Sequence, residues 1–362
     1  MTKFLLCLLM AIDVTQHGAD PSGVADSTAA IQAAFDAAAF QNVTDPVTGY
    51  VLAQTAPTVR FPSGRYKVSG TLNPRPICTI EGEKAILNQT ASVPTLVFAG
   101  ATTLAVRGLR ITGGTTAIAI SNANIDSSTF FIDDCHFDRT TDAAITVRGT
   151  GTSGQLSGIM EVSRCRFRGC NQALSTYIDM CHLNDCWISW TQAAIVPPGT
   201  VLGCIDVKRG RLSVTDTMLV PADFTAIPTQ HCWITSVGSV LAERSTFSGE
   251  NGGIPIIRFG ACPIDPNNSM GVVAHFTHCQ LSAGRTQNTA AAIVTLDAGT
   301  PQQIVIEKCR HLFAVPYIVD VNGTGATTAA ALPTPLQITI RNNTTWPRTM
   351  RVPEVLTQYL VP

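Results

Sequence analysis

The sequence predicts an all-β protein: a right-handed parallel β-helix, a solenoid of about ten coils capped by an N-terminal α-helix. Two observations carry this prediction. A short motif recurs along the chain at intervals of 21 to 34 residues, a period typical of solenoids. One amphipathic helical segment precedes the stretch of clear repeats. Because a solenoid grows by adding coils, a length of 362 residues does not call for a second domain.

The composition agrees with a turn-rich β protein. Charged residues make up only 14% of the chain and aromatic residues 6%, while hydrophobic residues make up 45%. These values argue against a disordered chain. The net charge is −1 and no basic run occurs, so we expect no nucleic-acid partner.

The predicted helix covers residues 27–39 and follows a turn at residues 20–23. Asp26 or Ser27 is suited to cap it, because a short polar side chain satisfies free N–H groups at a helix start. One face of the helix is apolar and carries Ile31, Ala34, Phe35 and Ala38. Residues 59–72 then read as a strand, a Pro-Ser-Gly turn and a second strand.

From about residue 77 onward the chain repeats a six-residue unit: an apolar residue, two others, a small residue, one other, and usually an apolar residue. We call its fourth position the ladder position. Its occupants are Glu83, Leu109, Cys135, Cys165, Cys186, Thr217, Ser245, Cys279, Cys309 and Asn343. The stretch from residue 135 to residue 309 is predicted to stack in one interior column, with rungs about 4.8 Å apart. A second strand per coil is predicted at residues 115–120, 141–147, 172–174, 192–195 and 291–294.

Five of the twelve cysteines occupy ladder positions. Adjacent rungs lie close enough for disulfides, but stacked side chains point the same way, which is poor geometry for a bond. We therefore expect packed, reduced thiols and folding in a reducing cytoplasm. No CxxC pair with a matching CxxC or HxxxH occurs, and we expect no metal site and no cofactor.

The predicted segments are an apolar N-terminal segment at 1–13, a capping region at 14–75, the β-helix at 76–345 and a C-terminal tail at 346–362. Residues 4–12 resemble a short signal peptide, but no A-x-A cleavage site follows. We favour an apolar peg or edge strand that docks on the first coil or on a partner. The segment is too short to span a bilayer.

Residues 18–35 and 59–72 resemble the start of pectate-lyase-like β-helix proteins. That superfamily includes bacteriophage tailspikes, capsule depolymerases and secreted polysaccharide hydrolases and lyases. The resemblance covers about 55 residues and implies a capping helix, a carbohydrate ligand and often a homotrimer. No motif here matches the catalytic signature of pectin-cleaving hydrolases or of calcium-dependent pectate lyases, so the resemblance assigns no catalytic residue.

The candidate site comes from the residue before each ladder position, which lies at a predicted bend. Asp185 and Asp216 fall on adjacent rungs, about 5 Å apart, a gap similar to that of a retaining glycosidase. They are our catalytic pair, with Asp134 and Glu243 as further candidates. The predicted saccharide-binding residues are Arg164, Arg166, Arg168, Trp187 and Trp190. The alternative is structural: Asp at a bend often bonds the neighbouring backbone.

Three functions remain open from the sequence. The first is a bacteriophage tailspike-like or tail-fibre-like protein, assembled in the host cytoplasm, that binds and can depolymerise a bacterial surface polysaccharide. Such a protein would form a homotrimer and contact other virion proteins through its N-terminal segment. The second is a secreted bacterial glycoside hydrolase or polysaccharide lyase. The third is a non-enzymatic virion adhesin or spacer.

Overall fold

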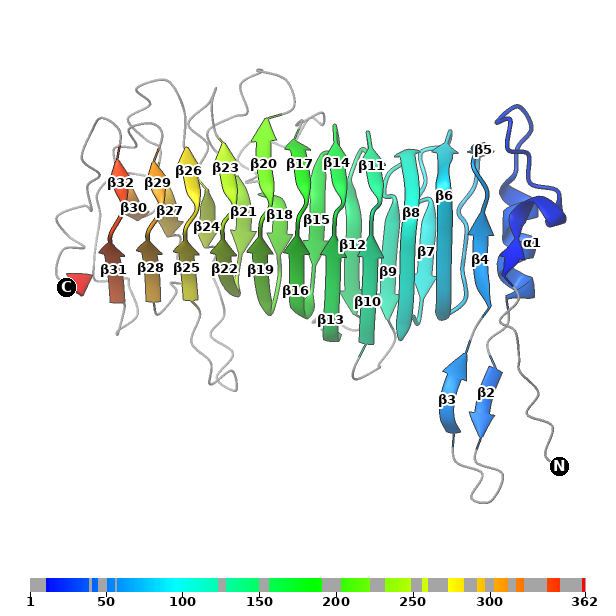
Figure 1. Cartoon of the computed structure of the whole chain (residues 1–362), viewed down its shortest axis with the longest axis horizontal. Helices are drawn as coiled ribbons and strands as arrows, with labels where there is room; N and C mark the ends of the chain where they lie inside the picture. Colours follow the sequence, from blue (N-terminus) through cyan, green and yellow to red (C-terminus); the bar gives the residue numbers. More distant parts are fainter. Residues whose placement is uncertain are drawn as a thin grey trace.

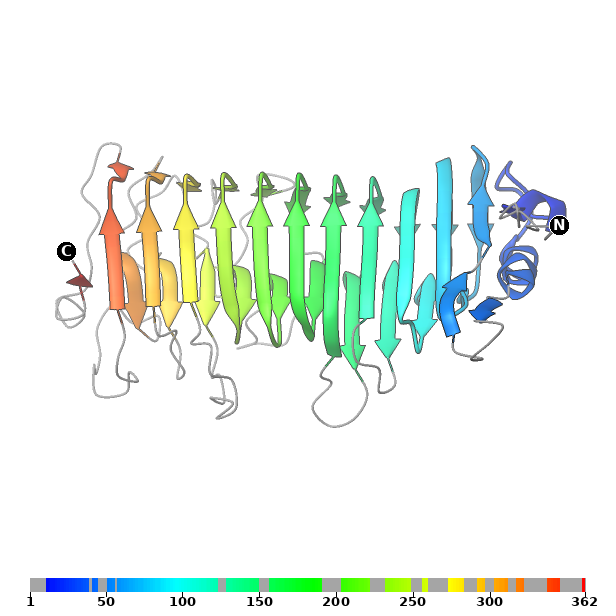
Figure 2. The same ribbon diagram turned by 60° about the horizontal axis from the view of Figure 1, so that its bottom comes forward.

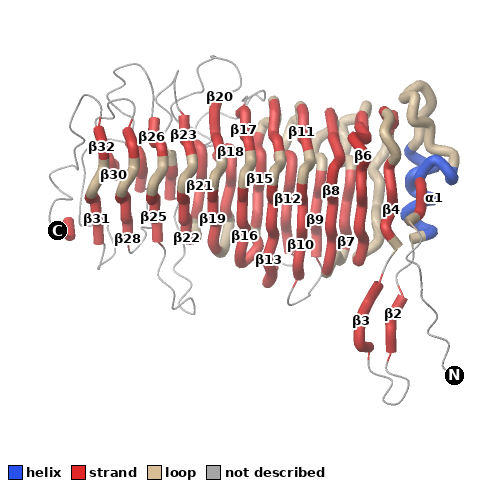
Figure 3. Tube along the Cα trace, in the orientation of Figure 1, coloured by secondary structure: helices blue, strands red, loops and turns tan. Residues whose placement is uncertain are grey.

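The protein is an elongated stack of parallel strands with one α-helix at its N-terminal end (Figure 1). The computed structural model describes residues 11–38, 41–44, 51–55, 57–122, 128–149, 156–190, 203–221, 232–248, 256–259, 273–282, 292–296, 303–311, 317–321, 337–345 and 360–361. Figure 3 shows strand throughout the stack, with helix only at its end. The predicted parallel β-helix fold is confirmed; the number of coils stays a prediction.

Most coils contribute two strands to a 22-stranded sheet, one before a bend and one after it. The strands before the bend are β4 (Thr58–Phe61), β10 (Ser128–Asp133), β13 (Leu156–Ser163), β16 (Ile178–Asn184), β19 (Arg211–Thr215), β22 (Ser239–Glu243), β25 (Val273–Thr277), β28 (Gln303–Glu307) and β31 (Gln337–Arg341). Those after it are β5 (Arg65–Val68), β11 (His136–Asp138), β14 (Arg166–Arg168), β17 (Trp187–Trp190), β20 (Met218–Pro221), β23 (Thr246–Ser248), β26 (Gln280–Ser282), β29 (Arg310–His311) and β32 (Thr344–Thr345). β6 (Ile77–Gln89) and β8 (Thr103–Gly113) run through the bend.

A nine-stranded parallel sheet forms a further wall of the stack (Figure 2). Its strands are β7 (Leu96–Ala99), β9 (Ile118–Asn122), β12 (Ala143–Gly149), β15 (Gln172–Thr176), β18 (Gly203–Val207), β21 (Cys232–Ser236), β24 (Ile257–Phe259), β27 (Ala292–Leu296) and β30 (Tyr317–Val321). The predicted second strands at 115–120, 141–147, 172–174 and 291–294 overlap β9, β12, β15 and β27. The one predicted at 192–195 lies outside the described residues.

The N-terminal end is closed by α1 (Thr28–Ala37), two residues shorter at its C-terminal end than the predicted helix. Ser27 occupies the N-cap position, but the capping bond comes from Asp26, whose carboxylate accepts the N–H of Thr28 at 2.9 Å. The apolar helical face predicted from the sequence is buried. β1 (Ile12–Asp13) continues into η1 (Val14–His17) and pairs with β4 at the edge of the sheet.

Three further strands lie outside the regular coils. β2 (Gln41–Thr44) and β3 (Val51–Thr55) pair antiparallel, and β33 (Leu360–Val361) pairs with β31. Residues 1–10 and 346–359, which fall in the predicted terminal segments, lie outside the described residues. Within the described chain, no helix is long and apolar enough to cross a membrane.

The ladder column is present as predicted. Val162 pairs with Leu183 and Phe167 pairs with Ile188, so Cys165 and Cys186 between them lie on neighbouring rungs. The same register links every ladder position from Cys135 to Asn343. The described ladder cysteines are buried, free thiols, and no disulfide joins any described pair.

The assignment of Glu83 to the ladder is wrong. The pairing of β6 with β8 shifts between Glu81 and Ala85, so Ala85 is the residue opposite Leu109. The backbones of Gly82 and Gly108 approach closely here: a Cβ on Gly108 would lie 2.3 Å from the Gly82 carbonyl oxygen. This bulge inserts two residues, and Glu83 turns outward to pair with Arg60.

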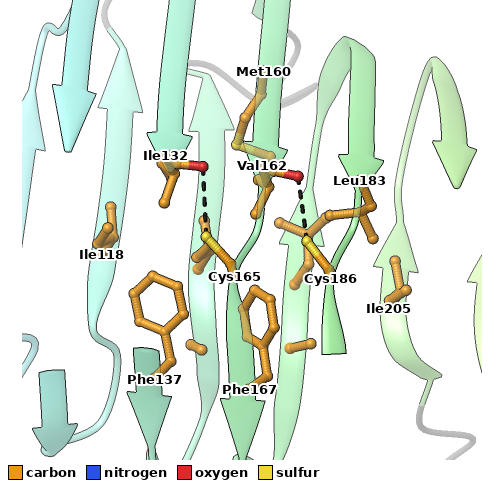
Figure 4. Close-up of a cluster of buried hydrophobic side chains, with 14 of the residues drawn as sticks. Ile118, Ile132, Phe137, Met160, Val162, Cys165, Phe167, Leu183, Cys186 and Ile205 are labelled. Atoms are coloured by element: carbon orange, nitrogen blue, oxygen red, sulfur yellow. Dashed lines mark hydrogen bonds between the residues drawn. The ribbon is translucent and has the colours of Figure 1, made fainter. Parts of the chain in front are cut away.

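Ladder side chains donate hydrogen bonds to backbone carbonyl groups beside the bend. The Cys165 thiol donates to the Ile132 carbonyl, 3.5 Å away on the preceding coil (Figure 4). It also donates to the Ser163 carbonyl, 3.2 Å away. The Thr217 hydroxyl donates to the Thr215 carbonyl at 2.9 Å and accepts the N–H of Cys186 at 3.3 Å. A small residue with a donor therefore suits each rung, which explains why the column mixes Cys, Thr and Ser.

Candidate functional site

A shallow groove of about 430 Å³ runs along the bends of four consecutive coils. Its lining residues are Asp134, His136, Arg164, Cys165, Arg166, Asp185, Cys186, Trp187, Asp216 and Met218. They come from three columns: the residue at each bend, the ladder residue that follows it, and the first residue of the strand after it. The groove therefore runs across the strands, from coil to coil.

Each bend residue has a left-handed backbone conformation, with φ between 47° and 55° from Asp134 to Asn342. Asp, Asn and His tolerate this conformation better than most side chains, but Arg and Lys occupy it here too. In the described residues, the carboxylates of Asp134, Asp185 and Asp216 make no hydrogen bond to a backbone group. The structural explanation for these aspartates, a hydrogen bond from the side chain to the neighbouring backbone, is therefore not supported. All three side chains are exposed.

The two members of the predicted catalytic pair have different surroundings. Arg244, one coil further on, holds both carboxylate oxygens of Asp216, with Nε–Oδ1 and Nη2–Oδ2 distances of 2.8 and 2.9 Å. Hydrogen bonding from Arg244 lowers the pKa of the Asp216 carboxyl below its usual value. Asp185 has no ion pair or side-chain hydrogen bond to any described residue. Asp216 is thus fixed as a carboxylate, and Asp185 is free to meet a ligand.

The cationic and aromatic residues of the groove lie beside these carboxylates. Arg166 lies over the ring of Trp187, with its guanidinium carbon 5.9 Å from the ring centroid. Arg164 forms an ion pair with Asp133 of the preceding coil. Partial burial, together with the charge of Arg166, lowers the pKa of His136, which favours its neutral form. Trp187 and Met218, on adjacent rungs, are 40% and 47% exposed and give the groove an apolar floor.

Six residues from the sequence-based site line the groove: Asp134, Asp185, Asp216, Arg164, Arg166 and Trp187. Glu243 lies outside it and forms an ion pair with Arg244. Arg168 is exposed on β14 but is not part of the lining.

Trp190 belongs to the core. It is 2% exposed, its Nε1 donates to the Asn171 carbonyl at 2.8 Å, and its ring packs against Trp233 with centroids 5.4 Å apart. A ring buried in this way cannot stack on a saccharide, so we remove Trp190 from the candidate site.

The sequence analysis missed His136 and Met218. Both follow a ladder residue, as Arg166 and Trp187 do, so aligning the repeats on the ladder would have found all four. The described residues contain no group of three or more His, Cys, Asp or Glu side chains placed to hold a metal ion.

A family model described as "Rhamnogalacturonase A/epimerase, pectate lyase-like" matches residues 11–195, which is 185 of the 362 residues and just over half of the chain. The chain belongs to this family. No curated protein sequence matches it.

Several solved structures share the fold at low identity. The ORF18 protein of Geobacillus virus E2 has 13% identity and a TM-score of 0.43, over 93% of this chain and 62% of its own. An alginate lyase from Paenibacillus has 13% identity and a TM-score of 0.42, over 84% of this chain and 92% of its own. The tailspike of Acinetobacter baumannii phage AM24 has 11% identity and a TM-score of 0.48, over 93% of this chain and 54% of its own. The chain thus spans less than two thirds of the viral proteins' length.

Proposed function

We propose that this β-helix binds a polysaccharide along the bend groove, with the glycan crossing the strands from coil to coil, and that it can cleave the chain. The observation that carries the proposal is the meeting of three carboxylates, the Arg166 guanidinium and an exposed Trp in one groove of a sparsely charged protein. Carboxylates and guanidinium groups bond sugar hydroxyls, and an aromatic face stacks on the apolar face of a sugar ring.

The catalytic part of the proposal assigns different roles to Asp185 and Asp216. Adjacent rungs are about 4.8 Å apart, close to the carboxyl separation of about 5 to 5.5 Å in retaining glycosidases. Asp216, ionised by Arg244, would act as the charged partner. Asp185 would act as the acid, because no described residue engages its carboxyl group and the bound sugar would cover it.

Asp134 offers a second geometry. It lies two rungs from Asp185, about 10 Å away, which approaches the wider gap that an inverting enzyme needs for a water molecule. Glu243 is a weaker candidate, because Arg244 engages it away from the groove. An eliminating enzyme would need a base in the same groove, so the proposal covers both a glycoside hydrolase and a polysaccharide lyase.

The test is cleavage of rhamnogalacturonan, alginate, α-1,3-glucan and a capsular polysaccharide of Acinetobacter baumannii. New reducing ends measure cleavage by hydrolysis, and the absorbance of unsaturated products measures cleavage by elimination. We expect the wild type to cleave at least one polymer. Asp185→Asn and Asp216→Asn should each lower kcat by at least about 100-fold, the usual scale for losing an acid or base, with unchanged melting temperature. If both folded variants keep full activity, the two aspartates have no catalytic role.

The finer proposal is a bacteriophage tailspike-like or tail-fibre-like protein that acts as a homotrimer on a bacterial surface polysaccharide and resides in the virion. The buried free thiols support assembly in a reducing host cytoplasm. The secreted enzyme is the alternative. The non-enzymatic adhesin is the outcome if the protein binds a polymer of the panel and cleaves none.

A further inference from the structure

A second, smaller hollow adjoins the groove on the face of the strands before the bend. It has a volume of about 140 Å³, which corresponds to about four or five water molecules at ~30 Å³ each. Its lining residues are Arg107, Phe131, Ile132, Asp133, Glu161, Ser163 and Arg164. None of these except Arg164 belongs to the main groove.

The two hollows share one wall. Arg164 lines both, and its ion pair with Asp133 lies where they meet. The lining residues follow consecutive coils: Arg107 pairs with Asp133, and Asp133 pairs with Ser163. From Arg107 to Asp216 the two hollows together cross five successive strands before or at the bend, or about 19 Å at 4.8 Å per coil. This length suits several sugar units of one bound chain.

The chemistry of the second hollow favours an uncharged ligand. Asp133 is paired with Arg164, and Arg107 lies 3.9 Å from Glu81. Glu161 has no ion pair with a described residue and accepts a hydrogen bond from the Ser163 hydroxyl at 3.0 Å. The uncompensated charge is therefore negative, and it would repel the carboxylate of a uronic acid.

Two features offer binding energy to a ring with hydroxyl groups. Phe131 is 38% exposed and presents an aromatic surface beside Glu161, its partner across the strands. The Oδ1 atom of Asp133 is buried and has no hydrogen-bond partner in the described part of the chain. A buried acceptor without a donor is unfavourable, so a small rotation of the Asp133 side chain that lets Oδ1 accept a sugar hydroxyl from the hollow would be favoured.

We infer that this hollow is a subsite for a neutral sugar residue, two coils away from the ring that stacks on Trp187. This inference rests on the proposed function and narrows its substrate class to glycans that contain neutral residues. Phe131 would stack on the ring, and Asp133 and Glu161 would accept hydroxyl protons. A chain made only of uronic acids would occupy the main groove but not this subsite.

The test measures oligosaccharide binding by calorimetry with two probes of equal length: rhamnogalacturonan fragments, which alternate neutral and acidic residues, and alginate fragments, which contain only uronic acids. The variants are Phe131→Ala and Glu161→Gln in the hollow and Trp187→Ala in the main groove. Ile159→Ala is the matched control, since Ile159 is also 38% exposed, lies on the adjacent strand and lines neither hollow.

We expect Phe131→Ala to weaken binding of rhamnogalacturonan fragments about tenfold and to leave alginate binding unchanged. Trp187→Ala should weaken both, and Ile159→Ala neither. If Trp187→Ala weakens binding but Phe131→Ala and Glu161→Gln do not, the subsite is refuted while the proposed function stands. If the wild type binds neither probe, the subsite is refuted, and the proposed function is decided by the remaining polymers of the cleavage panel. If Trp187→Ala changes the binding of neither probe, the main groove is refuted, and the subsite, which rests on it, is refuted with it.

Discussion

At the scale of single residues, the groove depends on the left-handed bend. A positive φ at the bend of each successive coil projects the bend side chains outward in one line, while the side chain of the next residue points inward to the ladder column. The conformation is costly for side chains other than Gly, Asn and Asp, by about 1 to 3 kcal/mol each, so regular pairing on both sides must hold it. The strand pairing on both sides fixes the backbone of the bend, so the side chain at each bend can vary with function.

The first prediction concerns the Arg244–Asp216 pair. Replacing Arg244 with Met should raise the pKa of Asp216 toward its ordinary value of 3.8, because the guanidinium that lowers it is gone. Carbon-detected NMR titration of the carboxyl measures this directly. The control is Lys308→Met, at the same bend position two coils further on.

The sign of the pH effect follows from the direction of that shift. A carboxyl whose folded pKa is depressed stabilises the protein above its unfolded pKa, and this contribution is lost as pH falls through the folded value. The ion pair should therefore add stability above about pH 4, and less under more acidic conditions. An Asp216 pKa that does not move in Arg244→Met would contradict the role given to this arginine.

The burial of Trp190 could not be predicted from its neighbours in the sequence. Its proximity to Trp187 in sequence suggested one aromatic surface, yet the two rings end up on opposite sides of the wall. Alternation along β17 breaks at its end, where both Ser189 and Trp190 are buried. The ring packs against Trp233, which comes from another coil, and no local sequence pattern predicts this contact.

At the scale of elements, the ladder column unites the two strands of each coil. Its predictability came from a chemical signal: a small Cys, Thr or Ser recurs at one position between apolar residues. The structure adds the reason, since the thiol or hydroxyl donates to backbone carbonyls beside the bend. Glu83 was wrongly assigned to the ladder column because the bulge in β6 adds residues without changing the apolar pattern around it.

The second prediction tests the ladder hydrogen bonds. Thr217→Val keeps the size of the side chain but removes the donor to Thr215 and the acceptor for the Cys186 N–H. The buried Cys186 N–H would lose its partner, while the Thr215 carbonyl would keep the hydrogen bond from the Asp185 N–H, so the free energy of unfolding should fall by about 1 to 3 kcal/mol.

Urea denaturation measures this change, and Thr217→Ser is the control because it keeps the hydroxyl and loses one methyl group, worth about 0.8 kcal/mol. If Val is tolerated better than Ser, packing outweighs hydrogen bonding in the column.

At the scale of the whole molecule, the stacked bends form a long wall that offers a linear site. The groove and the smaller hollow cross neighbouring coils, so a bound chain would lie along the stack. The sequence predicted the fold, the capping helix and most of the groove, because repeats place like positions side by side. It could not predict which bends would carry paired and which unpaired charges, since that depends on side-chain contacts between coils.

The third prediction is the assembly state. A homotrimer should sediment as one species of about three times 38.4 kDa at micromolar concentration. The resemblance to tailspike proteins motivates this expectation, together with a surface of low charge whose coil faces can pack. A single 38.4 kDa species under these conditions would count against the trimer, and with it against the tailspike proposal.

The central claim, that a polysaccharide lies in the bend groove, is tested most directly by a crystal structure of Asp185→Asn with an oligosaccharide of the polymer that the wild type binds. We expect sugar density that crosses the coils between Asp134 and Met218, with one ring stacked on Trp187. Density confined to another surface, such as the outer face of the β7–β30 sheet, would contradict it.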